Sequence, residues 1–546
     1  MKKLSSMLVV LLSFSLASCS MESNPEYDVV LKEDNTYEIV SLIGDKLYKE
    51  LVLPSEIDGV KVTSIAQVAF TYQTKLEKVT LPTYLEEIGD SAFMKCINLS
   101  SISMPSTLKK LGNSVFDSCT NLSSVTLNEG LTYIGSQTFS NCVALREFDF
   151  PDSLEYLGLN VFAGCHDLIE LTYDAKTVNY IDGWVINSLN IDGEVEIKDG
   201  TVGLSNYAFN DQELTSIKLP DSLKYIGLNA FNDCDKLETL YIGKNIKRID
   251  ENAFYKCKSL NNVYIADETP WHKVKIEDNA ELFRYADKVY YGDNLFEVYE
   301  VPYGEELIES NVFYNLKTLK EVVIPSTIKT ILKDAFAYTT SLKDIYIDDL
   351  SAWCKIDFET SMSNPLGYNK LILNTEVLQD IVIPMDVKEI KPYTFYMYKR
   401  LLSVELHDKI TLIGAYAFNS CENLKKINLD NVKHIDNFAF TGSGLYTVVL
   451  SENVITVGSH AFANCLNVGL ISIGENVNFI GALAFDYLPS LVTITFKDKE
   501  GWYVVQNPDD TEGIDLNIDE DYIYLALNYH LHNKENPYAG YTWKKR

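Results

Sequence analysis

The stretch LPTYLEEIGDSAFMKCINLSSIS, residues 81–103, decides the fold, because the chain repeats it with small changes. It is followed directly by MPSTLKKLGNSVFDSCTNLSSVT (104–126) and LNEGLTYIGSQTFSNCVALREFD (127–149). All three fit the frame apolar-Pro-x-x-Leu-x-x-Ile-Gly-x-x-Ala-Phe-x-x-Cys-x-x-Leu-x-x-Ile-x. A period of roughly 20 to 50 residues indicates supersecondary units that stack in one dimension, so each repeat is expected to form one rung of an elongated array.

One phenylalanine marks the register of every repeat. The first five are evenly spaced, one to a repeat, and much the same spacing returns later in the chain. These phenylalanines are Phe70, Phe93, Phe116, Phe139, Phe162, Phe231, Phe254, Phe313, Phe336, Phe395, Phe418, Phe440, Phe462 and Phe485. Two longer gaps of equal length, one after Phe254 and one after Phe336, interrupt the spacing. The array is therefore regular at first and contains longer modules in its second half.

Each repeat carries local signals for a strand and a turn. In the repeat of Phe93, the alternation from Leu99 to Met104 predicts a short parallel strand, and Pro105 ends it because proline cannot donate to the ladder. A glycine lies four residues before eight of these phenylalanines, as Gly89 does before Phe93. Its recurrence indicates either a positive backbone dihedral or a close approach between neighbouring rungs. Lys391 takes the place of this glycine, so its rung is expected to be locally different.

The repeat frame resembles the BspA-like, or treponemal-type, leucine-rich repeats of bacterial surface proteins. The resemblance covers residues 50–496 and rests on the motif L-x-x-I-x-[LM]-P followed by I-G-x-x-A-F-x-x-C. It implies a β-rich, right-handed leucine-rich-repeat solenoid with a parallel sheet along one face, short turns or 3-10 segments on the other, and β-rich end caps. It also implies adhesion or binding of host or matrix proteins at a cell surface, and it implies no catalytic residue.

A second, longer repeat lies within the array. Trp271 and Trp353 each follow a repeat phenylalanine at the same separation, and Trp502, placed in the same way, opens a third copy that never returns to a rung. The chain is predicted to consist of five parts. They are a signal peptide (1–18), a tether and N-terminal cap (19–50), repeats with one degenerate rung near 171–208 (51–254), repeats interrupted by two Trp-containing modules (255–496), and a C-terminal cap (497–546).

The first nineteen residues, MKKLSSMLVVLLSFSLASC, are typical of an export signal. The ending Leu-Ala-Ser-Cys resembles the lipobox of bacterial lipoproteins, which implies cleavage before Cys19 and lipidation of its thiol. An ordinary secretory leader with a cysteine at its cleavage site is the alternative. The lipoprotein interpretation predicts a protein of the cell envelope, held on a membrane by its N-terminal lipid and exposed outside the cytoplasm.

The cysteines repeat with the rungs. Eight of ten lie three residues after a repeat phenylalanine: Cys96, Cys119, Cys142, Cys165, Cys234, Cys257, Cys421 and Cys465. An exported protein with an even number of cysteines normally suggests disulfides. Because these eight occupy one position of the rung, we predict instead a buried ladder of reduced thiols that pack as small hydrophobic groups.

Composition and motifs disfavour several classes of function. The net charge of −30 repels phosphate backbones, so nucleic acid is not expected as a partner. No spacing of histidines and cysteines fits a metal site, and no cofactor-binding glycine loop is present. His272 and Cys354 follow the two module tryptophans, but they differ between copies, so neither is expected to be catalytic. We predict a protein that is not an enzyme and needs no cofactor or metal.

The outward face of the strands remains as the candidate binding surface. Tyr241, Tyr264 and Tyr346 occupy outward places there, and tyrosines on a rigid sheet offer contact area at low entropic cost. Tyrosine is also simply a good strand residue. We predict a monomeric surface protein that binds an extracellular or cell-surface protein, or a glycan, with an envelope scaffold that has no host ligand as the alternative.

Overall fold

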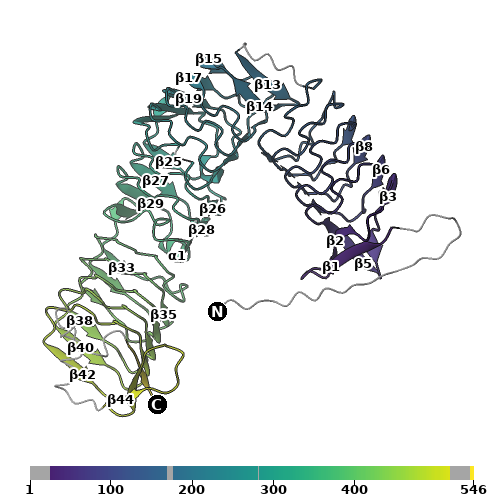
Figure 1. Cartoon of the computed structure of the whole chain (residues 1–546). Coiled ribbons are helices and arrows are strands. Elements are labelled where there is room, and N and C mark those ends of the chain that lie inside the picture. The colour runs from purple at the N-terminus through teal and green to yellow at the C-terminus, as the bar shows by residue number, and fades with distance from the viewer. Residues whose placement is uncertain (1–24, 169–175, 281, 517–540) are drawn as a thin grey trace. The chain divides into compact units, whose positions relative to one another are not determined.

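The computed structural model describes residues 25–168, 176–280, 282–516 and 541–546. The proposed signal peptide and Cys19 lie outside these residues. The described chain is a parallel-sheet β-solenoid of about 20 turns with almost no helix, which confirms the predicted fold class (Figure 1). It forms two compact units. Of the described residues, those within 1–269 and 277–286 form the first unit, and those within 270–276 and 287–546 form the second.

Most of the described rungs contribute two short parallel strands. The predicted strand is present as β8 (Ser101–Ser103) and β10 (Ser124–Thr126), which belong to successive rungs and pair in register. A second sheet, which the sequence analysis did not predict, is built from the Leu-x-x-Ile segment of the frame. In the first rungs it consists of β7 (Glu87–Ile88), β9 (Lys110–Leu111), β11 (Tyr133–Ile134) and β12 (Tyr156–Leu157).

The side of the rung that carries the phenylalanine is made of tight turns. The residues two before and two after Phe93, Ser91 and Lys95, have left-handed backbones with φ of 57° and 60°. The amides of these three residues donate to carbonyls of the next rung at 2.8–2.9 Å, while those of Ala92 and Met94 donate three residues back. Because consecutive amides alternate between the next rung and their own turn, each of these five donors has a backbone acceptor.

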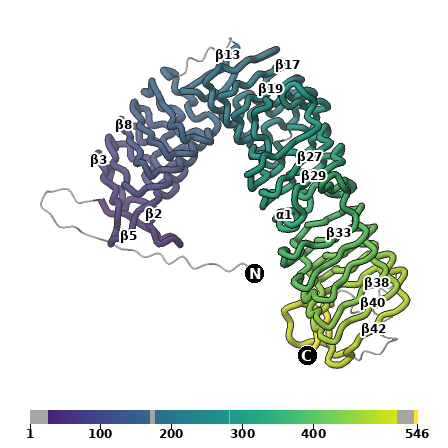
Figure 2. The backbone as a smooth tube through the Cα atoms, turned by 180° about the vertical axis from the view of Figure 1, so that it is seen from behind, coloured from purple at the N-terminus to yellow at the C-terminus, as the bar shows by residue number. Residues whose placement is uncertain are grey.

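The phenylalanines form the centre of the core. Phe70, Phe93, Phe116 and Phe139 are at most 1% exposed, and their rings stack at centroid distances of 5.2, 5.7 and 5.5 Å. The second unit repeats this arrangement around β38 (Thr447–Val449), β40 (Leu470–Ile473) and β42 (Thr493–Phe496), whose rungs lie one on another in Figure 2. Each ring is therefore buried mainly by the rungs on either side of it.

The recurring glycine serves a close approach between rungs. Its φ is not positive, but a Cβ on Gly89 would lie 2.6 Å from the amide nitrogen of Gln67, and one on Gly135 would lie 2.6 Å from the carbonyl of Gly112. Lys391, which replaces this glycine, follows a Trp-containing module rather than an ordinary rung. Its ammonium group pairs with Asp357 of that module at 2.5 Å. Of the two explanations that the sequence left open, the structure supports the close approach between rungs and not the positive backbone dihedral.

The cysteine thiols form a ladder of hydrogen bonds. The Sγ of Cys96 donates to the carbonyl of Phe70 at 3.3 Å, and that of Cys119 donates to the carbonyl of Phe93 at 3.2 Å. All eight ladder thiols bond in this way to the carbonyl of the preceding rung's phenylalanine. The described cysteines form no disulfide bonds and are buried. Each thiol is therefore directed at a backbone acceptor, as expected for a reduced ladder.

The two Trp-containing modules share one construction. Each begins with a short helical turn, η1 (Trp271–Lys273) or α1 (Leu350–Cys354). The indole nitrogen of each module tryptophan donates to a carbonyl 41 residues later, Val312 in the first module and Thr394 in the second. Each module also contains an antiparallel hairpin, β23 (Lys288–Tyr291) with β24 (Asn294–Leu295), and β31 (Lys370–Leu373) with β32 (Glu376–Val377).

Besides the two module hairpins, antiparallel strands lie near the ends of the described array and in the range assigned to a degenerate rung. Near the N-terminus, β1 (Tyr27–Leu31) pairs antiparallel with β2 (Tyr37–Leu42), which joins the solenoid through β5 (Val60–Ile65). Within the range assigned to a degenerate rung, β13 (Thr177–Ile181) and β14 (Trp184–Leu189) form a hairpin. Near the C-terminus, β45 (Thr542–Lys545) pairs antiparallel with β41 (Phe479–Ile480) and β43 (Trp502–Val505). The domain boundaries remain predictions.

Candidate functional site

A row of outward side chains crosses four neighbouring strands of the first unit. These strands are β15 (Asp192–Glu196), β17 (Glu213–Lys218), β19 (Thr239–Ile242) and β21 (Asn262–Ile265). Their register places Glu196 beside Lys218, Lys218 beside Tyr241, and Tyr241 beside Tyr264. Lys218 and Glu196 form an ion pair at 2.6 Å. The sheet thus presents one charge pair followed by two aromatic rings.

The two tyrosines of this row contact each other closely. Their ring centroids are 4.7 Å apart and their planes differ by 12°. Tyr241 is 39% exposed, whereas its neighbours Leu240 and Ile242 point into the core. Because each ring covers one face of the other, the pair offers ring edges and hydroxyl groups more readily than two open faces.

Tyr346, the third predicted binding residue, belongs to the second unit. It lies on β29 (Asp344–Ile347), paired with Val323 on one side and Ile372 on the other. Partial burial and the carboxylates of Glu321 and Asp344 raise its phenol pKa. The structure therefore pairs Tyr241 with Tyr264, whereas the strand neighbours of Tyr346 are Val323 and Ile372.

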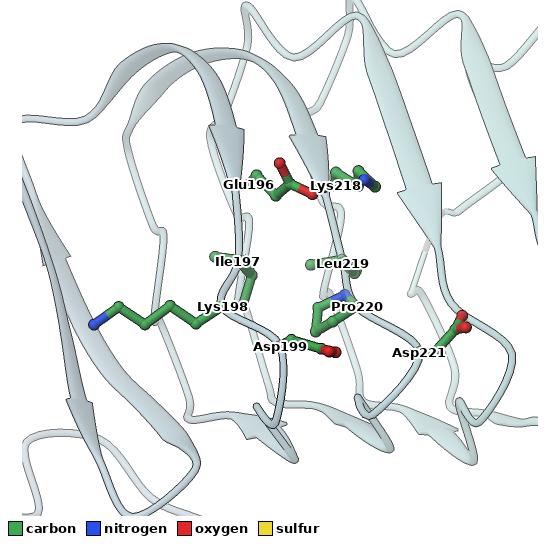
Figure 3. Close-up of a pocket in the computed structure, with 8 residues that line it drawn as sticks. All are labelled: Glu196, Ile197, Lys198, Asp199, Lys218, Leu219, Pro220 and Asp221. Atoms are coloured by element: carbon green, nitrogen blue, oxygen red, sulfur yellow. Dashed lines mark hydrogen bonds and ion pairs between the residues drawn. The ribbon is translucent and has the colours of Figure 1, made fainter.

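A hollow of 570 Å³ lies where β15 and β17 end (Figure 3). It is lined by two parallel segments, Glu196 to Asp199 and Lys218 to Asp221. In Figure 3 the side chain of Lys198 extends away from the other labelled residues, and its ammonium group lies 4.5 Å from the ring centre of Tyr180. Since Glu196 and Lys218 line the hollow and also begin the tyrosine row, both features belong to one face, which we call the strand face.

The residues considered for catalysis are buried in the modules. Cys354 is fully buried, which raises its thiol pKa and disfavours the reactive thiolate. His272 is also buried, with Nδ1 2.8 Å from the hydroxyl of Tyr299, and burial lowers its pKa. Within the described residues, no group of three or more His, Cys, Asp or Glu side chains is placed to hold a metal ion. Nor does that part of the chain contain a helix of the length and apolarity needed to cross a membrane.

One aromatic cluster escaped the sequence analysis. Four rungs of the second unit carry Tyr393, Tyr416, Phe438 and His460 two residues before the repeat phenylalanine, and we call this set the aromatic ridge. The rings stack in order at centroid distances of 5.2, 4.8 and 4.7 Å, and all four are half-buried. Aligning the repeats at this position would have revealed it, but attention to the strand residues did not.

A model of a known protein family matches the repeats of this chain. The model of the "BspA type Leucine rich repeat region" matches in six copies, over residues 42–169, 187–280, 284–360 and 369–492. The chain belongs to the BspA-type leucine-rich repeat family. This family builds a binding scaffold, and its relatives include bacterial cell-surface proteins. Comparison with curated proteins gives no match.

Several solved structures of leucine-rich repeat proteins are similar to this chain. A leucine-rich cell surface protein from Faecalibacterium prausnitzii is 21% identical, covering 63% of this chain and 99% of its own, with a TM-score of 0.27. A leucine-rich repeat protein from Bacteroides ovatus is 20% identical, covering 87% and 94%, with a TM-score of 0.27. The leucine-rich repeat protein of T. pallidum is 23% identical, covering 54% and 87%, with a TM-score of 0.21. At these identities the likeness concerns the fold alone.

Proposed function

We propose that the chain is a lipid-anchored bacterial surface protein whose solenoid binds an extracellular protein through the strand face. The observation that carries this proposal is the row of Lys218, Tyr241 and Tyr264 on a rigid sheet beside an open hollow. Tyrosine is enriched at protein interfaces because it buries a large area while few side-chain rotations are lost. Leucine-rich repeat proteins as a class also bind protein ligands.

The charges of the strand face support a protein partner. Within the hollow, Lys218 is paired with Glu196 and Lys198 lies over Tyr180, whereas Asp199 and Asp221 also line it. A lysine or arginine side chain of a partner would meet two carboxylates there. Charge pairing of this kind speeds association and selects the partner more than it adds affinity.

Binding assays on the full chain test the strand face. Soluble matrix proteins, glycan arrays and whole host cells are the probes, and Tyr241→Ser combined with Tyr264→Ser is the variant. We expect saturable binding to a protein that falls about tenfold or more in the variant, because central interface tyrosines contribute about 2 kcal/mol or more. Tyr303→Ser is the control, since Tyr303 is 78% exposed and lies in the other unit. Binding that survives the double substitution contradicts the role of this row.

The lipid anchor is tested separately from binding. Cells that express the chain are labelled with a clickable fatty acid, and the labelled protein is compared with a Cys19→Ala variant. We expect the parent chain to carry the label and to associate with the membrane. The variant lacks the thiol that would be lipidated, so it should carry no label and be released into the medium. Release of both proteins into the medium without label would support the ordinary secretory leader, and equal membrane association of both would indicate another anchor.

An envelope-scaffold role is the competing proposal. It predicts that a strain without this chain has a weakened envelope, measured as sensitivity to detergent, and adheres to host cells as the parent strain does. The proposed adhesion function predicts reduced adherence and unchanged detergent sensitivity. The two measurements on one strain therefore separate the two functions.

A further inference from the structure

A sheet of the second unit ends at a strand with one edge that no described strand covers. β38, β40 and β42 pair in parallel and in that order, and among the described strands none pairs with the edge of β42 that faces away from β40. The amide of Thr493 donates to the carbonyl of Gly469 on the β40 side at 3.2 Å. Because successive residues of a strand direct their backbone groups to alternate sides, the amides and carbonyls of Ile494 and Phe496 point toward the other edge, which we call the open edge.

The sequence of β42 does not protect this open edge. Natural sheets usually protect an edge strand with charged residues, proline, a bulge or a covering segment. The stretch VTITF (492–496) contains no charged residue and no proline, and its pairing with β40 has a constant register. Its first residue, Val492, is 74% exposed. An uncharged edge strand of this kind is a template for another strand, so the pattern favours a segment that covers it.

The second Trp-containing module shows how a corresponding edge is covered. Its strand β29 ends six residues before Trp353, as β42 ends six residues before Trp502. The chain then returns as β31, which begins with Lys370 opposite Asp344 and pairs in parallel with β29. The amide of Lys370 donates to the carbonyl of Lys343 at 2.7 Å. The first module contains a strand at the same place, since β23 begins 26 residues after the start of β21, the separation also found between β29 and β31.

The segment that follows Trp502 carries the sequence pattern of such a returning strand. The stretch YIYL (522–525), which lies outside the described residues, has apolar residues at the same alternate places as KLIL in β31 and TITF in β42. It begins 29 residues after the start of β42, three more than the separation in the two modules. The hairpin of β43 with β44 (Ile514–Asp515) lies in this interval, where the second module has the helix α1. The third copy therefore holds the pattern of a returning strand at nearly the same place.

The described chain stops close to the end of β42. The amide of Leu516 donates to the carbonyl of Trp502 at 2.8 Å, and the ring of Trp502 lies 5.6 Å from that of Phe496, the last residue of β42. The described chain resumes before β45, which pairs with β43. The 24 residues between these points can extend about 80 Å, whereas β42 is about 13 Å long. The segment is therefore long enough to run along the open edge and return.

We propose that residues 522–525 dock on the open edge of β42 as a parallel strand, in the register that β31 has on β29. Tyr522 then lies opposite Thr493. The same register directs the amide of Tyr524 to the carbonyl of Ile494. The third module thus returns a strand to the sheet without starting another rung.

The docked strand continues both faces of the sheet. Ile494 and Phe496 are buried, and the register places Ile523 and Leu525 beside them on the inward face, where they add a layer of apolar side chains to the end of the core. Tyr524 falls on the outward face. The tyrosine row of the strand face lies in the first unit, so this inference goes beyond the proposed function and does not depend on it.

Hydrogen exchange of the full chain tests the docking, read at single amides by mass spectrometry with electron-transfer fragmentation. Tyr524→Pro removes the amide that the proposed register directs to the carbonyl of Ile494. Ile523→Ser keeps every backbone donor and removes an apolar contact, so it serves as a second, milder change. Lys534→Pro is the matched control, because it introduces proline into the same segment outside the proposed strand.

The proposal predicts slow exchange at the amides of Ile494 and Phe496 in the parent chain. Their exchange is expected to be about tenfold or more faster in Tyr524→Pro, less accelerated in Ile523→Ser, and unchanged in Lys534→Pro. The amide of Thr493 bonds to β40 in every case, so its exchange is expected to stay slow. Exchange at Ile494 and Phe496 that neither variant of the proposed strand changes overturns the proposal. Equal acceleration of Thr493 and Ile494 in both of these variants also overturns it, because the segment would then stabilise the whole end of the array and not this edge.

Other occupants of the open edge give different results. A second copy of the chain would slow exchange at Ile494 and Phe496 only at protein concentrations where analytical ultracentrifugation shows a dimer, and that result overturns the proposal. Fast exchange at both amides in the parent at every concentration also overturns it, since the edge would then be open to a strand of another protein. Slow exchange in a monomeric parent, lost in Tyr524→Pro, supports the docked segment.

Discussion

A single glycine of the repeat tests whether close contact between rungs limits stability. Gly458 lies four residues before Phe462, and a Cβ added there would come within 2.4 Å of the amide nitrogen of Asn437 and 2.5 Å of the carbonyl carbon of Asp436. Both atoms belong to the backbone of the preceding rung, which cannot move without breaking contacts of its own. Because the φ of Gly458 is not positive, Gly458→Ala changes the space and hardly the conformational preference.

The expected effect follows from overpacking. Inserting atoms into a packed interior costs about 1–3 kcal/mol, and the upper end applies here because both contacts are with backbone atoms. We therefore expect Gly458→Ala to lower the free energy of unfolding of the second unit by about 3 kcal/mol.

Gly469→Ala provides a matched control in the same rung. Its φ is not positive either, and the nearest atom to an added Cβ is the carbonyl oxygen of Ser490 at 3.7 Å. We expect this change to be neutral, or to stabilise by up to about 1 kcal/mol because alanine restricts the unfolded chain.

Urea unfolding followed by circular dichroism gives the stability of each protein, and native-state hydrogen exchange localises the effect. Repeat arrays can unfold in parts, so exchange at the amides of Asn437, Gly458 and Phe462 is the decisive measurement. These amides are expected to exchange faster in Gly458→Ala than in Gly469→Ala. Equal stability and equal exchange in the two variants would refute the reasoning that the recurring glycine exists for close packing.

Three further changes probe buried polar groups. Burial lowers the pKa of His272, so the unfolded chain binds a proton that the folded chain does not. The folded state therefore loses stability as the pH falls below about 6.5, and it loses none above that pH. We expect His272→Cys, which copies the residue of the second module, to make the melting temperature less dependent on pH in this range. Cys142→Ala removes the donor to the carbonyl of Phe116 and should cost about 1–3 kcal/mol in urea unfolding, whereas Cys142→Ser keeps a donor and should cost less. Tyr398→Phe removes a hydroxyl that donates to the carbonyl of Leu378 at 2.5 Å and should also cost about 1–3 kcal/mol, with hydrogen exchange as the readout.

The architecture was accessible from the sequence because its determinants are periodic. A phenylalanine at a constant spacing, alternation before a proline and cysteine at one rung position are sufficient to predict a solenoid, its parallel strands and a ladder of thiols. Spacing alone also revealed the module marked by Trp271 and Trp353, whose indoles each bond 41 residues ahead. The second sheet was missed because two-residue strands such as Glu87–Ile88 are too short to show alternation.

The candidate sites were only partly accessible. Outward positions follow from alternation, so Tyr241 and Tyr264 could be placed on one face before their contact was known. The hollow beside them could not be predicted, because it depends on how the segments after β15 and β17 bend. The aromatic ridge lay on the turn side, where no simple periodicity states which side chains reach solvent.

The sequence by itself determined that this chain stacks rungs, which side chains fill the core, and where the stack is interrupted, since each of these depends on contacts that recur at a constant separation. Only the tertiary structure decided why the glycines recur, which tyrosines meet, and that aromatic rings occupy left-handed positions in four successive rungs. Those features depend on distances of a few ångströms between residues of different rungs and on backbone dihedrals. A sequence pattern gives the neighbours of a residue, whereas the three-dimensional structure gives the space between them.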